Sequence, residues 1–336
     1  MLAPDSSTGA GCCTNILVLR GGALGDLILT LPTLRELRKG YPGAHIQLRG
    51  VFPQARLAPP KIVDSIDRVD SPDMAPIFAD GPLPATLRER LGKFDIAINL
   101  FDDPDSVMSR NLAAAGVKSV VGRPRMKAAK EHVVYQLAAA LEPLGLALSD
   151  PVPSLEIELP LVRSPLLAVH VGSGSPQKNW PIDYWINLIA RLEPQFREIL
   201  LVGGEADFVA VREFLSHSRF RNLKTLMNAE LNDLIRALSR CTLFIGHDTG
   251  VSHLAAAVGT PTVVLFGPTD ARVWAPLGEN VSVIAARDGR MASIQVEEVL
   301  ASLKCTPGPQ KSRKIRGKAV IAGSSIDAAR LLMSLF

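Results

Sequence analysis

The sequence has few aromatic residues, few cysteines and no apolar run long enough to cross a membrane. Aromatic residues make up 5% of the 336 positions, which disfavours a protein that stacks single-stranded nucleic acid on aromatic rings, and we expect no nucleic-acid partner. The four cysteines form no C-x-x-C pair. We therefore expect neither a metal site nor a disulfide framework, and infer a reducing compartment. Residues 1–14 lack the basic and apolar regions of a signal peptide, so a cytoplasmic location is expected.

The chain is long enough for two domains. Its hydrophobic content of 47% can supply two cores. The stretch from Ser149 to Pro165 contains four prolines and is typical of a linker. We predict an N-terminal domain over 1–158, a second domain over 159–318 and a terminal helix over 319–336. The net charge of +4 favours an anionic substrate or membrane surface, although plain solvation explains it equally well.

Short apolar runs alternate with amphipathic segments in both halves. Such alternation predicts an α/β protein in which each domain is a doubly wound, Rossmann-like parallel sheet. The strands are expected over residues 15–20, 45–48, 94–100, 119–121, 166–171, 199–202, 242–245 and 262–266.

The stretch from Thr242 to Gly267 reads as a strand, a loop, a helix and a second strand. The loop residues Thr249 and Gly250 lie just before a helix predicted over 251–258, whose first turn leaves N–H groups unpaired and carries a partial positive charge. A strand opening onto such a helix can bind a phosphate or pyrophosphate, with Asp248 and His253 beside it. The alternative is that Asp248 and Thr249 simply cap the helix and His253 packs.

Three further polar side chains are expected at the same edge of the second sheet. Lys178 lies in a glycine- and serine-rich loop after one predicted strand, and can neutralise a phosphate. Glu205 follows another strand, where a carboxylate can accept hydrogen bonds from a ribose diol. Thr269 follows the strand over 262–266. A surface lysine without a partner is the plain alternative for Lys178.

A glycine-rich loop, Gly21 to Asp26, follows the first predicted strand. It lacks the full G-x-G-x-x-G pattern of dinucleotide-binding proteins, and the carboxylate of Asp26 would repel a pyrophosphate. The next strand is followed by Arg49, which only an NADP enzyme would tolerate. Asp26 can instead serve as a general base, or simply stabilise the first turn of its helix.

Acidic and basic residues follow two other strands of the first domain. Asp103 and Asp105 have a spacing found in some magnesium sites, but we interpret the segment as a turn or as the rim of an acceptor site. Arg123 and Arg125 can bind an anionic acceptor or remain solvated. The candidate acceptor contacts are Gly25, Arg49, Asp103, Arg123 and Arg125.

Four segments, in this order, resemble the motifs of one known family. They are Gly22-Ala-Leu-Gly-Asp26, Lys178-Asn-Trp-Pro181, Gly246-His-Asp-Thr-Gly-Val-Ser-His253 and Phe266-Gly-Pro-Thr-Asp270. The family is glycosyltransferase family 9, the ADP-heptose:lipopolysaccharide heptosyltransferases. The chain departs from the family's pattern at residues 102–105, which bears on the acceptor.

The resemblance implies a GT-B fold, in which two domains face a central cleft, and inverting transfer without a metal or cofactor. The donor would be a nucleotide-diphosphate sugar such as ADP-heptose, and the acceptor an anionic glycolipid of the lipopolysaccharide core, reached from the inner face of the membrane. Asp26 matches the base, Asp248 the donor-sugar contact, and Lys178, Thr249 and Gly250 the pyrophosphate contacts. The rival interpretations are an NADP-dependent oxidoreductase and a non-catalytic nucleotide-sugar-binding protein.

Overall fold

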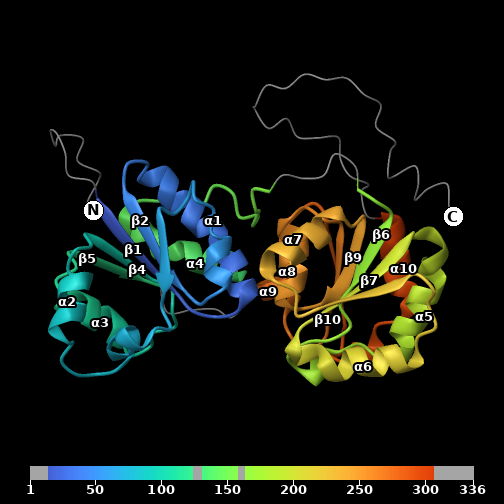
Figure 1. Cartoon of the computed structure of the whole chain (residues 1–336). Coiled ribbons are helices and arrows are strands. Elements are labelled where there is room, and N and C mark those ends of the chain that lie inside the picture. Colours follow the sequence, from blue (N-terminus) through green and yellow to red (C-terminus); the bar gives the residue numbers. More distant parts are fainter. Residues whose placement is uncertain (1–13, 124–130, 158–162, 306–336) are drawn as a thin grey trace, which may run out of the picture. The chain divides into compact units, whose positions relative to one another are not determined.

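The computed structural model describes residues 14–123, 131–157 and 163–305. The chain divides into two compact units, residues 1–156 and 157–336 (Figure 1). The predicted terminal helix over 319–336 and the predicted acceptor contact Arg125 lie outside the described residues.

The N-terminal unit is built on a five-stranded sheet within the described residues. All its neighbouring strands pair in parallel, in the order β3-β2-β1-β4-β5. The strands are β1 (Asn15–Arg20), β2 (His45–Gly50), β3 (Ser65–Arg68), β4 (Ile96–Asn99) and β5 (Ser119–Gly122).

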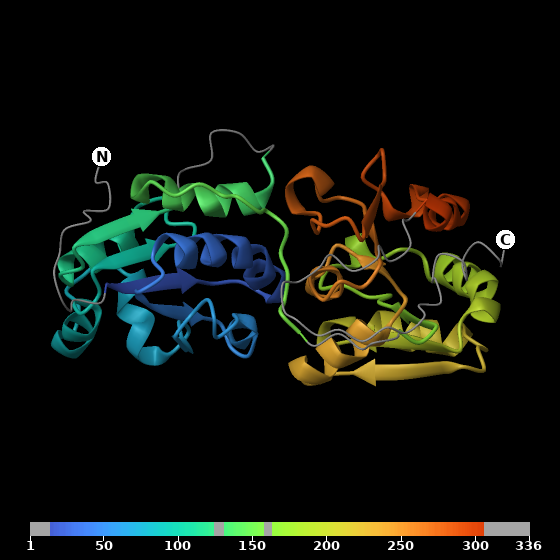
Figure 2. The same ribbon diagram turned by 90° about the horizontal axis from the view of Figure 1, so that it is seen from above.

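Helices cover both faces of this sheet (Figures 1 and 2). Because side chains alternate along a strand, Leu17 and Leu19 of β1 point to one face. There they join a buried cluster with Leu87 of α2 (Ala85–Leu91) and Leu112 of α3 (Val107–Ala114). The helices α1 (Leu24–Gly40) and α4 (Val133–Ala138) contact each other and cover the opposite face (Figure 1).

The C-terminal unit contains six described strands in one parallel sheet. Their order is β11-β10-β9-β6-β7-β8, which is the 3-2-1-4-5-6 order of a doubly wound dinucleotide-binding fold. The strands are β6 (Leu166–Val169), β7 (Glu198–Gly203), β8 (Leu223–Met227), β9 (Leu243–His247), β10 (Thr262–Phe266) and β11 (Val281–Ala285).

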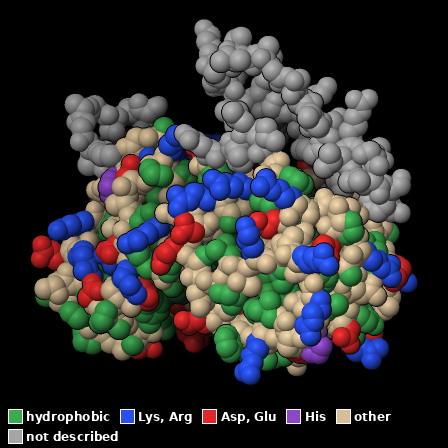
Figure 3. Space-filling view, turned by 45° about the vertical axis from the view of Figure 1, so that its right-hand side comes forward, with side chains coloured by type: hydrophobic (Ala, Val, Ile, Leu, Met, Phe, Trp, Pro, Cys, Tyr) green, Lys and Arg blue, Asp and Glu red, His purple; other side chains and the backbone are tan. Residues whose placement is uncertain are grey.

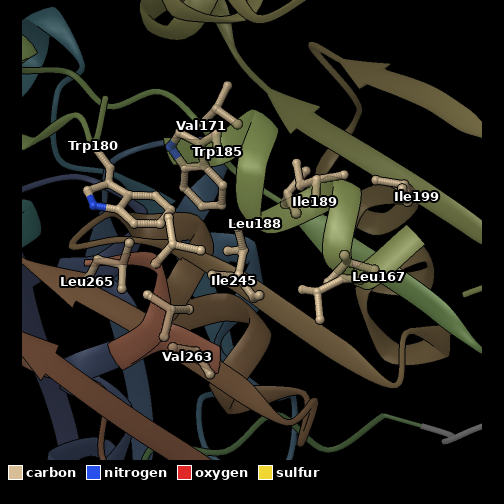
Figure 4. Close-up of a cluster of buried hydrophobic side chains, with 14 of the residues drawn as sticks. Leu167, Val171, Trp180, Trp185, Leu188, Ile189, Ile199, Ile245, Val263 and Leu265 are labelled. Atoms are coloured by element: carbon tan, nitrogen blue, oxygen red, sulfur yellow. The ribbon is translucent and has the colours of Figure 1, made fainter. Parts of the chain in front are cut away.

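The core of this unit lies between the sheet and α5 (Ile182–Leu192), α6 (Phe208–His217) and α10 (Val296–Cys305). Trp185, Leu188 and Ile189 of α5 pack on Ile245 and other alternate residues of the central strands, as Figure 4 shows. The other face is covered by α7 (Leu231–Arg240) and α8 (Gly250–Ala257). Helix α8 contacts β9 and β10.

The sequence predicted the central strands and missed three at the edges. The missed strands β3, β8 and β11 each lie at an edge of their sheet, and none contains a buried residue. An edge strand has a neighbour on one side only, so its sequence needs fewer apolar residues than a central one.

Charged side chains of both signs are interspersed over the face shown in Figure 3. Ion pairs at the surface of the described residues include Lys61 with Glu156 and Arg272 with Asp270. Among the described residues, no helix has the length and hydropathy needed to cross a bilayer.

Candidate active site

The strand order places a topological switch point between β6 and β9 of the C-terminal unit. From β6, the chain winds outward to β7 and β8 on one side and from β9 to β10 and β11 on the other. Open parallel sheets bind ligands beyond the carboxyl ends of the strands at such a point. His170 follows β6 directly, and Asp248 and Thr249 follow β9.

Asp248 joins two of the predicted donor contacts. Its Oδ2 accepts a hydrogen bond of 2.7 Å from Nζ of Lys178 and one of 2.8 Å from Oγ1 of Thr269. The Asp248 side chain is 10% exposed and that of Lys178 28%. The lysine therefore has a partner, contrary to the plain alternative, and its ammonium is held at the carboxyl edge of the sheet with part of its surface open to solvent.

Thr249 is the N-cap residue of α8, but its hydroxyl does not cap the helix. A threonine at this position commonly accepts a hydrogen bond from an N–H of the first turn. Here Oγ1 lies 3.1 Å from Nδ1 of His170 and 3.5 Å from Oγ of Ser252. The alternative in which Asp248 and Thr249 only cap the helix is not observed, because Thr249 makes no side-chain capping bond and Asp248 is bonded to Lys178 and Thr269.

His170 is held in turn by a buried carboxylate. Its Nε2 lies 3.0 Å from Oδ2 of Asp207, which also accepts a 2.7 Å hydrogen bond from the N–H of Gly204. Burial tends to raise the pKa of Asp207, but the bonds from His170 and Gly204 outweigh it and hold that pKa below its usual value. A Cβ on Gly172 would lie 2.5 Å from Oδ1 of Asp207, so glycine is needed there.

His247 fixes the loop that carries Lys178. Its Nε2 accepts a hydrogen bond of 3.0 Å from the N–H of Trp180, so Nδ1 carries the proton and donates to the carbonyl of Gly172 at 3.2 Å. Its ring meets that of Trp185 edge-on at 5.4 Å. Burial lowers the pKa of His247 to about 3, so the imidazole is neutral at physiological pH.

The remaining predicted donor contacts differ in exposure. Glu205 is exposed at the start of a 3-10 turn (Glu205–Asp207) that follows β7. Gly250 is the first residue of α8 and is half-buried. His253 lies in α8 and is 5% exposed.

In the N-terminal unit, Asp26 lies in the first turn of α1 with both carboxylate oxygens bound. Oδ1 accepts a hydrogen bond of 2.9 Å from Nη2 of Arg20, and Oδ2 accepts one of 2.8 Å from the N–H of Ala23. The side chain of Asp26 is 32% exposed and that of Arg20 9%. Arg20 also donates to Oγ1 of Thr30 at 2.9 Å, so the cation that fixes Asp26 is itself held in place.

Gly22 gives Asp26 the room it occupies. Its φ of +94° lies in the region that side chains disfavour. A Cβ at this position would lie 2.5 Å from Cγ of Asp26. The glycine loop of this sequence therefore cradles a carboxylate of the protein.

The predicted acceptor contacts are largely engaged within the unit. Arg49 is 3% exposed and pairs with Asp67 at 2.5 Å. Asp103 accepts hydrogen bonds from the N–H groups of Met108 and Ser109 in the first turn of α3, at 3.2 and 3.0 Å. The structure thus gives Asp103 the role of a turn residue.

Two other acceptor candidates are described. Gly25 is the second residue of α1 and half-buried, and Arg123 donates to Oε1 of Gln136 at 2.8 Å. No group of three or more potential metal ligands of the His, Cys, Asp and Glu types occurs within the described residues.

Sequence reasoning missed Arg20, His170, Asp207 and His247. Arg20 and His170 lie within predicted strands and were therefore not considered as site residues. Each is a charged or polar residue near the end of an apolar run, and that position could have indicated a role at the sheet edge. Asp207 lies two residues beyond Glu205, which was chosen because it comes first after the strand. No sequence signal distinguishes a buried carboxylate from an exposed one at this spacing.

Comparison with solved structures identifies the class of fold. The Escherichia coli heptosyltransferase WaaC with ADP aligns with a TM-score of 0.69 and 20% identity over 88% of this chain and 100% of that chain. The E. coli ADP-heptose lipopolysaccharide heptosyltransferase II aligns with a TM-score of 0.70 and 20% identity over 87% and 98%. The fold is GT-B, which confirms the predicted fold class.

Comparison of sequences identifies the family. The family model described as glycosyltransferase family 9 (heptosyltransferase) matches residues 90–303. Lipopolysaccharide heptosyltransferase 3 of E. coli K12 is 25% identical over 289 residues, 76% of this chain and 83% of the relative. The alignment with lipooligosaccharide heptosyltransferase 2 of Haemophilus influenzae is 26% identical over 125 residues and spans only 36% of each chain.

The chain belongs to glycosyltransferase family 9. The resemblance inferred from its motifs is thereby confirmed, and the protein is a glycosyltransferase. The structure also removes the basis for the oxidoreductase interpretation, because Arg49, the residue meant for the 2′-phosphate of NADP, is buried against Asp67.

Proposed function

We propose that this enzyme transfers a heptose, or a related sugar, from a nucleotide-diphosphate sugar to a hydroxyl of an anionic glycolipid, with inversion at the anomeric carbon and without a metal. The observation that carries the proposal is the pairing of Lys178 with Asp248 beside the uncapped first turn of α8. The N–H groups at the start of α8 are positively polarised, and the ammonium of Lys178, paired with Asp248, lies at the same carboxyl edge of the sheet. An ADP-sugar is the favoured donor, since two solved structures of one relative, E. coli WaaC, carry ADP and ADP-2-deoxy-2-fluoro heptose.

The donor-binding groups supply positive charge where negative charge develops. As the glycosidic bond breaks, negative charge accumulates on the leaving diphosphate. The ammonium of Lys178 and the N–H groups at the start of α8 are already oriented before the reaction, so little reorganisation opposes it. Glu205 is exposed beyond β7, where it can accept hydrogen bonds from the ribose, and His253 completes the proposed donor site.

Asp26 is the proposed general base. Its carboxylate takes the proton from the acceptor hydroxyl as the oxygen attacks the anomeric carbon, and a positioned base contributes about 10²–10⁴-fold to the rate. The two bonds from Arg20 and Ala23 fix the carboxylate without burying it. Gly25, Arg123 and Arg125 are proposed to contact the acceptor, while Arg49 and Asp103 would act there only by shaping the surrounding loops.

The deciding experiment is the substitution Asp26→Asn in a transfer assay with ADP-heptose and a lipopolysaccharide-core acceptor. The rate should fall by about 10²–10⁴-fold while the Kd for ADP stays unchanged. Asp80→Asn is a matched control, because Asp80 forms an exposed ion pair with Arg110 in the same unit. Transfer by Asp26→Asn at the wild-type rate would rule out this base.

The same assay separates the remaining alternatives. Activity in EDTA should equal activity without it, because Lys178 and α8 supply the positive charge. Loss that Mg²⁺ restores would instead implicate Asp103 or Asp105. A protein that binds ADP and transfers to no acceptor would be a nucleotide-sugar-binding protein. Cosedimentation with anionic vesicles tests the proposed peripheral position at the inner face of the cytoplasmic membrane.

A further inference from the structure

Thr249, the N-cap residue of α8, has a hydroxyl that can block the proposed anion site at the start of this helix. When a threonine caps its helix, its Oγ accepts a hydrogen bond from a first-turn N–H. An incoming diphosphate needs the same N–H groups. A self-capping Thr249 would therefore compete with the donor.

The hydroxyl of Thr249 has a hydrogen-bond partner in His170. The Oγ1 atom of Thr249 lies 3.1 Å from Nδ1 of His170 and 3.5 Å from Oγ of Ser252, and it accepts no capping hydrogen bond from a backbone N–H of α8. His170 is 2% exposed and follows the central strand β6. The hydroxyl is thus held away from α8 by a rigidly placed, buried ring.

Asp207 determines which way the hydrogen bond between His170 and Thr249 runs. An ionised carboxylate can only accept hydrogen bonds, so the 3.0 Å contact between Asp207 and Nε2 of His170 places a proton on Nε2. In the neutral ring, Nδ1 is then an acceptor and the hydroxyl of Thr249 donates to it. This assignment gives the hydroxyl a partner other than α8.

We propose that His170, oriented by Asp207, is a positioning residue that keeps the first turn of α8 open for the diphosphate of the donor by withdrawing the hydroxyl of Thr249. The inference rests on the proposed function, since it assumes that a diphosphate binds at α8. It adds His170 and Asp207 to the proposed donor site as positioning residues that act through Thr249.

A matched pair of substitutions separates the two contacts of His170. The amide of asparagine reaches the position of Nδ1, so His170→Asn can still accept from Thr249 while it loses the contact with Asp207. The amide of glutamine reaches the position of Nε2, so His170→Gln keeps the contact with Asp207 and loses Thr249. Titration calorimetry with ADP and with inorganic pyrophosphate should give a Kd about fivefold to tenfold higher for His170→Gln. His170→Asn should bind close to wild type.

Thr249→Val provides the second half of the test. Valine cannot cap α8, so the Kd values of Thr249→Val for both probes serve as the reference for this background, and adding His170→Gln to it should cause no further loss. Equilibrium unfolding establishes that each variant is folded. A merely structural role of His170 would weaken binding in both His170 variants alike, and in the valine background as much as without it.

Each outcome decides the matter. Equal affinity of wild type and His170→Gln, or a loss that persists with valine, overturns the inference and leaves the proposed function standing. Failure of the wild-type enzyme to bind either ADP or pyrophosphate overturns both.

Discussion

At the scale of single residues, two glycines make room for carboxylates of the protein itself. A Cβ on Gly22 would lie 2.5 Å from the carboxyl group of Asp26, and a Cβ on Gly172 would lie 2.5 Å from that of Asp207. In dinucleotide-binding folds the corresponding glycines let a ligand approach the backbone. Here the approaching groups are a proposed base and a buried partner of His170.

Gly22→Ala tests this use of glycine. Alanine at a φ of +94° is strained by about 1–3 kcal/mol, and its methyl group would displace the carboxylate of Asp26. The rate of transfer should fall strongly while the Kd for ADP is unchanged, as activity assays and calorimetry would show. Gly43→Ala is the matched control, because a Cβ there meets no atom within 4 Å. Equal activity of the two variants would contradict the proposed constraint on Asp26.

At the scale of elements, His247 at the end of β9 ties together the loops that form the site. It accepts from the N–H of Trp180 and donates to the carbonyl of Gly172. Trp180 is 1% exposed and also donates through Nε1 to the carbonyl of Ile294. Lys178 is only two residues from this anchor, so its position depends on packing as well as on its ion pair.

The buried imidazole predicts an acid-sensitive stability. The pKa of His247 is about 3 in the folded protein and about 6.5 when unfolded, so the unfolded state binds more protons between these values. The neutral His247 therefore makes its full contribution to the free energy of unfolding above the unfolded pKa. As pH falls below 6.5, the free energy of unfolding decreases by about 1.4 kcal/mol for each pH unit.

His247→Gln is the variant that checks it. Glutamine can accept from the N–H of Trp180 but does not titrate. Urea unfolding at pH 7.5 and 5.5 should show a smaller decrease in the free energy of unfolding for the variant than for the wild type. The same decrease in both proteins would show that other groups cause the acid sensitivity.

At the scale of the whole molecule, the proposed donor contacts belong to one unit. Lys178, Glu205, Asp248, Thr249 and Thr269 all follow strands of the C-terminal sheet, whereas Asp26 follows β1 of the N-terminal sheet. The two chemical tasks, holding the leaving group and accepting a proton, are assigned to separate sheets of the same parallel type.

Hydrogen exchange measured by mass spectrometry tests this division. ADP without acceptor should slow exchange in α8 and in the segment from His170 to Trp180, because ligand contact stabilises these elements against local opening. Exchange in β1 and the first turn of α1 should change less. Protection that is strongest in α1 would place the nucleotide beside Asp26 and contradict the assignment.

The sequence by itself determined the local units of this protein. Buried strands such as β1 and β10 were predicted with the bounds that the structure has, because apolar residues gather in central strands whatever surrounds them. The loop before α8 was identified from glycine, hydroxyl and carboxyl groups at a strand end. The motifs around Asp26, Lys178 and Asp248 identified the family.

Only the tertiary structure decided which side chains meet. His170 and Asp207 are 37 residues apart, and Lys178 and Asp248 are 70 apart. The strand order β7-β6-β9 brings the loops that follow these strands together at one edge. The pattern of apolar residues predicts that a strand is buried. It does not predict which strand lies beside it in the sheet. The partner of Thr249, on which the proposed opening of α8 rests, therefore had to be taken from the fold.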